Sequence, residues 1–102
     1  LEPGVAAALA AGFRALGDPT RVAIVNRLAG AGEVCVCELT EAFQLGQPTI
    51  SHHLKVLRDA GLLTSQRRAS WVYYAVVPEA LDALSALLSA VAASAAAEAV
   101  SR

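Results

Sequence analysis

Methionine is absent from this 102-residue sequence, and aromatic side chains are few: one tryptophan, two tyrosines and two phenylalanines make up 5% of the chain. Proteins that hold single-stranded nucleic acid stack its bases on aromatic rings, so this composition argues against that class. No apolar run approaches the length that spans a bilayer, and no secretory segment is present. We therefore expect a cytoplasmic protein that has no membrane partner.

The sequence also lacks the features of an enzyme. Neither a phosphate-binding loop nor an oxyanion loop accompanies its two cysteines and two histidines, and no base is placed beside a nucleophile. We therefore expect no catalytic residues. The length of the chain predicts one domain, residues 1–102, with a core small enough to gain stability from pairing with a second copy.

Charged residues are 17% of the chain, and the net charge of −1 by itself argues against a nucleic-acid-binding protein. The distribution of charge argues the other way. Residues 44–77 carry four basic side chains against one acidic side chain, whereas the segments on either side are both net negative. A net positive charge is therefore confined to residues 44–77, as a local contact with DNA phosphates requires.

Within this basic segment, residues 47–63 are typical of one helix with two chemically different faces. Pro48 suits the first turn of a helix, and Gly61 suits the left-handed position just past its end. Three apolar residues recur at helical spacing and predict the buried face: Ile50, Leu54 and Leu57. The other arc is polar, and we predict that it lies in the major groove of double-stranded DNA.

The remaining segments predict a mainly α protein with a β-hairpin, in the order α-α-α-α-β-β-α. Further helices are expected over residues 5–16, 19–29, 38–43 and 78–102, with an extended piece over residues 33–37. Alternating apolar residues after Gly61 predict two strands, residues 62–66 and 71–77, joined by the loop Arg67-Arg68-Ala69-Ser70.

These elements together make a winged helix-turn-helix. Residues 38–61 are the predicted helix-turn-helix, and residues 62–77 are the predicted wing. The first and last helices, residues 1–16 and 78–102, carry more apolar surface than so small a core can cover. We therefore predict that they pair two copies into a homodimer.

Four motifs occur in the order and spacing of one known family: Leu16-Gly17-Asp18-Pro19-Thr20-Arg21, Gln47-Pro48-Thr49-Ile50-Ser51-His52-His53-Leu54-Lys55-Val56-Leu57, Ala60-Gly61-Leu62 and Trp71-Val72-Tyr73-Tyr74. They resemble the ArsR/SmtB family, which implies a bacterial winged-helix transcriptional repressor that releases DNA when a metal or metalloid binds. Cys35-Val36-Cys37-Glu38-Leu39 further resembles the thiolate box of the arsenic-responsive branch, which implies As(III) or Sb(III) as effector and no organic cofactor. Gly46 and Ala69 depart from the family pattern, where serine and glycine are usual.

Seven side chains are predicted to contact operator DNA: Gln47, Thr49, Ser51, His52, Lys55, Arg67 and Arg68. Of the five on the helix, Thr49 and Lys55 suit phosphates, and the other three suit base edges. The adjacent arginines have no acid near them in sequence, so we expect them to reach phosphates or the minor groove. His53 falls near Leu57 on the helix and is predicted to be packed or hydrogen-bonded instead.

Cys35 and Cys37 are the candidate metal ligands. Two residues apart, they make a poor structural disulfide and fit a reduced compartment. Their side chains share one side of an extended segment but lie about 200° apart on a helix, so one ion reaches both only where the helix start is not helical. A helix N-terminus lowers the pKa of a thiol, and thiolates without nearby histidine suit thiophilic ions better than zinc or nickel.

The source of a third ligand is open. The family's thiolate box has another cysteine three residues after the second, and Thr40 stands at that position here. The third group comes from an N-terminal extension before Leu1, from the other subunit, or from no protein group if the effector is an organoarsenical. We favour a cysteine in an extension. The alternative functions are a thiol-redox switch, a sensor of cadmium, lead or mercury, and an organoarsenical sensor that uses two thiolates.

Overall fold

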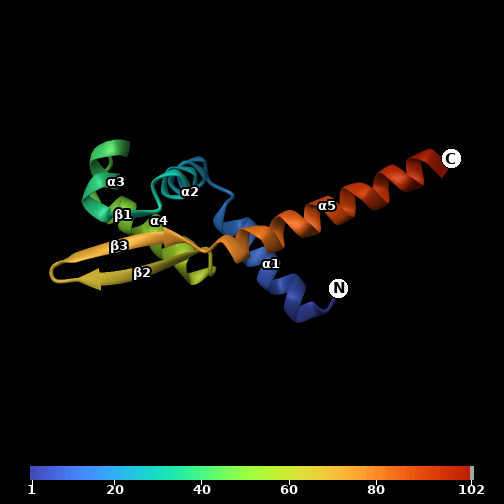
Figure 1. Ribbon diagram of the computed structural model, residues 1–102, viewed down its shortest axis with the longest axis horizontal. Helices are drawn as coiled ribbons and strands as arrows, with labels where there is room; N and C mark the ends of the chain where they lie inside the picture. Colours follow the sequence, from blue (N-terminus) through green and yellow to red (C-terminus); the bar gives the residue numbers. More distant parts are fainter. Residues whose placement is uncertain (102) are drawn as a thin grey trace.

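The computed structural model describes the backbone of residues 1–101 and the side chains of residues 1–99. Arg102, the end of the predicted last helix, lies outside the described residues. Eight elements follow one another along the chain (Figure 1): α1 Pro3–Ala15, α2 Pro19–Ala31, β1 Glu33–Cys35, α3 Val36–Phe43, α4 Gln47–Asp59, β2 Leu63–Arg68, β3 Trp71–Val76 and α5 Pro78–Ser101. The predicted winged helix-turn-helix is confirmed, with α3 and α4 as its two helices and β2 and β3 as its wing.

A cap and an arginine fix how α1, α2 and α4 meet. The Asp18 carboxylate accepts hydrogen bonds from the backbone N–H groups of Arg21 (3.1 Å) and Thr20 (2.8 Å), and these bonds lower the pKa of Asp18. The Arg21 side chain donates from Nε to the carbonyl of Ala15 at 2.6 Å. Its Nη1 lies 3.4 Å from Nδ1 of His53, so His53 has the hydrogen-bonded environment predicted for it.

The core lies where these helices cover one face of the sheet. The predicted buried face of α4 is confirmed, because Ile50, Leu54 and Leu57 are all fully buried. Their largest buried neighbours come from four other elements and from the turn after α4: Ile24, Leu28, Val34, Leu39, Leu62 and Leu63. Gly61 has φ +81°, so it ends the helical region in the left-handed conformation that its position predicted. The opposite arc of α4 is thereby held in solvent.

The sheet has three strands, one more than the predicted hairpin. All are antiparallel in the order β1-β3-β2, and β1 pairs with β3 through the registers Glu33 with Ala75 and Cys35 with Tyr73. The predicted loop was too long. Arg67 and Arg68 belong to β2, and the connection is only Ala69 and Ser70, because Ala69 adopts φ +56° and turns the chain without a glycine.

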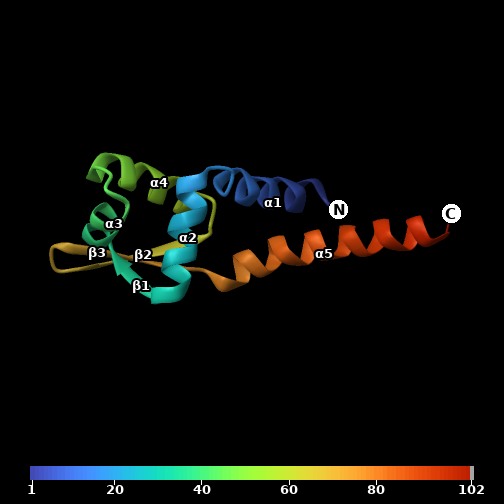
Figure 2. The ribbon, with the colours of Figure 1, turned by 90° about the horizontal axis from the view of Figure 1, so that it is seen from above.

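Helix α5 stands apart from the body. Figures 1 and 2 show α1 and α5 both pointing away from the sheet, with α5 reaching much further. Within it, Pro78–Ala99 is long and apolar enough to cross a membrane by length and composition, with a mean hydropathy of 1.6, and nearly all of it is exposed. The expectation that no apolar run reaches this length was therefore wrong, because alanine-rich helix continues far beyond the leucines that touch the core.

Candidate thiol site and nucleic-acid interface

The five predicted DNA contacts on α4 all lie on its exposed arc: Gln47, Thr49, Ser51, His52 and Lys55. Lys55 also donates to Asp59 at 2.6 Å, one helical turn further on. The Lys55 hydrogen bond lowers the pKa of Asp59. Both side chains are more than half exposed, so this ion pair is weak and leaves Lys55 available to a stronger anion.

Cys35 and Cys37 meet at the junction between β1 and α3. Cys35 is buried and still extended, with φ −76° and ψ 148°, and it precedes the first residue of α3. Cys37 is exposed in the first turn of that helix, and its Sγ donates a hydrogen bond to Sγ of Cys35 at 2.9 Å. The extended piece was predicted to reach residue 37. The structure ends it at Cys35, yet the change from strand to helix still brings both sulfurs together.

The pKa of Cys37 is raised, which contradicts the lowering expected at a helix N-terminus. The main cause is its hydrogen bond to Cys35, because ionising Cys37 would remove the donated proton. Desolvation acts in the same direction, and the backbone hydrogen bond from Glu38 opposes both. The hydrogen bond between the two sulfurs therefore favours the protonated form of Cys37.

A cavity of about 220 Å³ opens beside the two sulfurs. Its near wall is the thiol junction, Cys35, Val36 and Cys37 with Thr40 one turn later. Its far walls come from two other elements: Gln47 at the start of α4, and the wing residues Ser70, Trp71 and Val72. The cavity is therefore bordered by the two thiols, by the start of α4 and by the wing.

Sequence comparisons agree with this arrangement. Residues 18–65 match the family model described as bacterial regulatory protein, arsR family. An arsenical resistance operon repressor of Bacillus subtilis is 42% identical over 72 residues, which cover 71% of this chain and 69% of that protein. The chain belongs to the ArsR family.

Two further proteins extend the likeness. The match to an arsenic resistance transcriptional regulator of Pseudomonas putida is 47% identical and covers 78% of this chain but 62% of that protein. A homodimeric winged helix-turn-helix DNA-binding domain from Mycobacterium bovis, a possible ArsR-family regulator, superposes with a TM-score of 0.72 at 27% identity, covering 87% of this chain and 82% of that one. ArsR-family proteins are transcriptional regulators, which confirms that this chain is not an enzyme.

In this ArsR-family chain one face of the sheet joins the thiols to the wing. Side chains alternate along each strand, so the registers place eight residues on that face, which we call the sensor face: Glu33, Cys35, Thr64, Gln66, Arg68, Trp71, Tyr73 and Ala75. Arg67 falls on the opposite face. The two adjacent arginines therefore cannot act as a pair.

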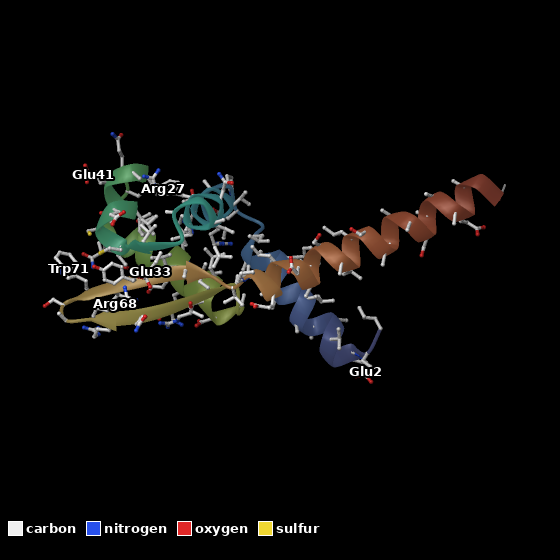
Figure 3. The ribbon with its side chains drawn as sticks, in the orientation of Figure 1. Glu2, Arg27, Glu33, Glu41, Arg68 and Trp71 are labelled. Carbon is white, nitrogen blue, oxygen red and sulfur yellow. The ribbon has the colours of Figure 1, made fainter. Side chains whose placement is uncertain are left out.

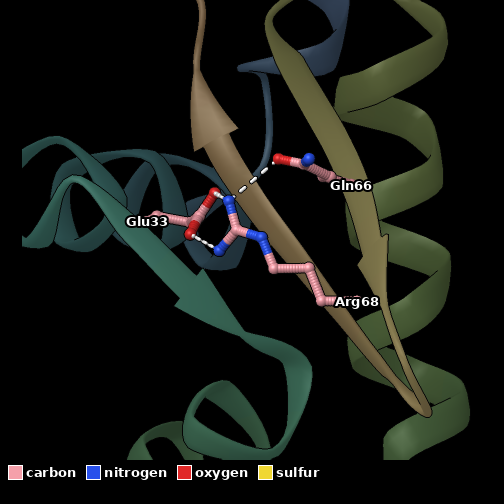
Figure 4. A network of polar contacts seen from close by, with 3 residues as sticks. All are labelled: Glu33, Gln66 and Arg68. Atoms are coloured by element: carbon pink, nitrogen blue, oxygen red, sulfur yellow. Dashed lines mark hydrogen bonds and ion pairs between the residues drawn. The ribbon is translucent and has the colours of Figure 1, made fainter.

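Arg68 is engaged within the protein, as Figure 4 shows. Its two terminal nitrogens donate to both carboxylate oxygens of Glu33, with Nη2 to Oε2 at 3.0 Å, and Nη2 also donates to Oε1 of Gln66 at 2.9 Å. The guanidinium lies 5.0 Å from the ring centre of Tyr73. By contrast, no hydrogen bond or ion pair joins Arg67 to another side chain within residues 1–99.

Sequence reasoning did not find two residues of this region, Glu33 and Trp71. Glu33 meets an arginine 35 positions away, and only the pairing of β1 with β3 brings them together. The sequence predicted Trp71 only as a residue of the hairpin. It is 54% exposed and lies at the tip of the sheet near the start of α3 (Figure 3). Within residues 1–99, no three His, Cys, Asp or Glu side chains cluster to hold a metal ion.

Proposed function

We propose that this chain is a homodimeric, cytoplasmic repressor that binds an inverted-repeat operator and releases it when As(III) or Sb(III) binds Cys35 and Cys37. The observation that carries the proposal is the pair of sulfurs 2.9 Å apart at the junction that leads into the helix-turn-helix. Two of the chain's relatives, at 47% and 42% identity, are named as regulators of arsenic or arsenical resistance, in support of this effector class.

On the DNA side, α4 lies in the major groove and places its exposed arc against bases and phosphates. Gln47, Ser51 and His52 read base edges, while Thr49 and Lys55 contact phosphates. Arg67 and Arg68 reach the backbone or the minor groove beside it. All seven are exposed, as this role requires.

The partner on the protein side is a second copy of the chain. Leu88 and Val91 on α5 are each 58% exposed, and α1 lies beside the same end of the molecule. Burying such apolar side chains against a copy stabilises a dimer. A two-fold axis then presents two α4 helices to half-sites about one helical turn apart, roughly 34 Å.

Release begins with the thiols. Each thiol proton leaves with one hydroxyl of arsenous acid as water, so two As–O bonds give way to two As–S bonds and arsenic stays trivalent. Cys35 belongs to the sheet and Cys37 to α3, so one ion held by both fixes the strand–helix angle. Because α3 leads into α4 through a three-residue turn, that angle changes the position of α4. A coupling of about 1–3 kcal/mol weakens operator binding roughly 5–150-fold.

The test is arsenite-driven release of labelled operator, followed by fluorescence anisotropy. Cys35→Ser and Cys37→Ser should each bind the operator yet keep it in arsenite, whereas Ser65→Ala, an exposed change on the other face of β2, should release it normally. Sulfur-to-arsenic absorption should count two thiolates in the wild-type chain. Unchanged release by both cysteine variants would refute the proposal. Release only by peroxide indicates a redox switch, and release only by cadmium, lead or mercury indicates another metal.

A further inference from the structure

One arginine joins three helices at the side of α4. Arg21 lies in the first turn of α2, and its Nε donates to the carbonyl of Ala15 at 2.6 Å, one of the carbonyls that the end of α1 leaves without a partner in its own helix. Its Nη1 lies 3.4 Å from Nδ1 of His53 on α4, 32 positions further along the chain. A single guanidinium therefore ties α4 to the ends of α1 and α2.

The chemistry of this contact requires one protonation state of His53. A guanidinium carries only donors and stays charged, so Nδ1 must be the acceptor and the ring proton must lie on Nε2. A protonated ring carries a proton on both nitrogens and offers no acceptor. It would also bring a second positive charge to within 3.4 Å of an Arg21 nitrogen. The contact therefore exists only while His53 is neutral.

His53 is placed where it can set the direction of the exposed arc. Its ring is half-buried, and it follows His52 directly on the helix, so the two side chains point about 100° apart around the axis. The apolar contacts that hold α4 on the core have no preferred direction. A hydrogen bond to a ring nitrogen has one, so it fixes the rotation of α4 about its axis. That rotation decides where His52 and the rest of the arc point.

The charged groups around His53 come from several elements. Asp18, the cap of α2, lies in the electrostatic field of both Arg21 and His53, but its carboxylate is already bound by backbone N–H groups of its own helix. Arg14 on α1 borders a separate cavity that it shares with Asp59. Within residues 1–99, no side chain of α3 or β2, which also pack on α4, forms a hydrogen bond or an ion pair with His53. Arg21 is therefore the charge that a protonated His53 would meet first.

We propose that Arg21 and His53 are positioning residues for DNA binding, and that their contact makes operator affinity depend on pH independently of the thiols. This inference rests on the DNA-binding part of the proposed function. Histidine is the side chain whose charge ordinarily changes between pH 5 and 8. At pH 8 the neutral ring accepts the hydrogen bond, and α4 is held in the orientation that fits DNA. At pH 5.5 the protonated ring loses this bond and is repelled by Arg21, so operator affinity falls.

The experiment measures affinity by fluorescence anisotropy between pH 5.5 and 8, on a labelled duplex that the wild-type chain selects from random-sequence DNA at pH 8. The sequence has only two histidines, so few of its groups change charge in this range. His53→Gln offers an amide oxygen to Arg21 at every pH, so it should match the wild type at pH 8. On acidification, wild-type affinity should fall roughly fivefold or more relative to this variant.

Three further variants separate this contact from other effects. Arg21→Leu removes the donor, so its affinity should already be reduced at pH 8 and should change less with pH. His52→Gln removes the other histidine, whose protonated ring would attract phosphates, so the loss of affinity in acid should persist. Val22→Ala is the matched control, because Val22 is 51% exposed and adjacent to Arg21 in the sequence. It should keep the wild-type pH profile.

NMR of the ring nitrogens in the wild-type chain tests the contact directly and does not depend on how the variants fold. The proton of neutral His53 should be found on Nε2, and a proton on Nδ1 would overturn the inference. A full wild-type fall of affinity in His53→Gln or Arg21→Leu, or its disappearance in His52→Gln, would also overturn it. Failure of the wild-type chain to select and bind any duplex at pH 8 would instead refute the proposed DNA binding.

Discussion

The exposed arc of α4 and the sensor face both carry side chains suited to DNA, but they are held in different ways. On α4, Thr49 and Ser51 make no side-chain hydrogen bond within residues 1–99, and His52 meets only the ring of His53, 6.0 Å away. On the sensor face, Arg68 is fixed by Glu33, which sits two residues before Cys35 on the same strand. The side chains of the arc are therefore exposed and available to DNA. Arg68, by contrast, is paired with Glu33 on β1, the strand that also carries Cys35.

Under the proposed function, this difference separates two routes from ligand to DNA. One runs from the thiols through α3 to α4. The other runs along β1 to Glu33 and changes how much of the Arg68 charge is left for phosphate. Arg67 lies on the opposite face and has no acidic partner within residues 1–99, so it serves as the reference for an unpaired arginine.

The largest effect should come from the arc. His52→Ala should weaken binding to the operator roughly 5–150-fold, since a base-edge hydrogen-bond pair discriminates by about 1–3 kcal/mol. Binding to scrambled duplex of the same length should change little. Anisotropy with both duplexes measures the ratio, and Asn26→Ala on the exposed side of α2 serves as control. Equal losses on both duplexes would mean that His52 does not read sequence.

A smaller effect, of opposite sign, is expected on the sensor face. Glu33→Gln removes the carboxylate that competes with phosphate for Arg68, so operator affinity should rise by roughly 3–10-fold near 0.1 M salt. The salt slope of log affinity should steepen by about 1. Anisotropy titrations over a range of salt concentrations measure both quantities.

Arginine variants supply the control for that measurement. In the wild-type chain, Arg67→Gln should weaken operator binding more than Arg68→Gln, because the second arginine is already neutralised. When each arginine variant is combined with Glu33→Gln, the two losses of operator affinity should become similar. Weaker binding by Glu33→Gln alone would show instead that the ion pair holds the wing in its DNA-binding position.

The smallest effect concerns the thiols. Cys35→Ala removes the hydrogen bond that raises the pKa of Cys37, so more thiolate should be present at pH 8 and iodoacetamide should alkylate Cys37 faster. The gain should vanish at a pH above the pKa of Cys37 in both proteins, where the thiolate already dominates. Mass spectrometry measures the rate.

Cys35→Ser should give an intermediate alkylation rate, because its hydroxyl can still accept the hydrogen bond. Operator binding without effector should be the same in both variants. That result would show that the substitutions change the thiol chemistry without disturbing the exposed arc of α4. Slower alkylation in Cys35→Ala would contradict the assigned cause of the raised pKa.

Neighbouring residues in the sequence predicted the exposed arc of α4 but not the contacts on the sensor face. Pro48, Gly61 and the spacing of Ile50 and Leu54 act within one helix, so the start, end and buried side of α4 followed from neighbouring residues. The pairing of Glu33 with Arg68 depends on which strands pair, and a three-residue strand leaves little periodicity to show it.

The thiol junction lay between these two cases. The need for non-helical geometry was apparent from the spacing of Cys35 and Cys37, but the boundary at Val36 was not. The raised pKa of Cys37 also could not be predicted, because it depends on a sulfur–sulfur contact and outweighs the general effect of a helix N-terminus.

The exposure of α5 has a consequence in mass action. In the proposed dimer, a second copy covers side chains such as Leu88 and Val91, which then contribute to stability only while that copy is bound. The thermal midpoint should then rise with protein concentration, and the fraction of operator occupied should fall more steeply than in proportion when the protein is diluted. The number of molecules in a cell thereby sets a threshold for repression before any effector arrives.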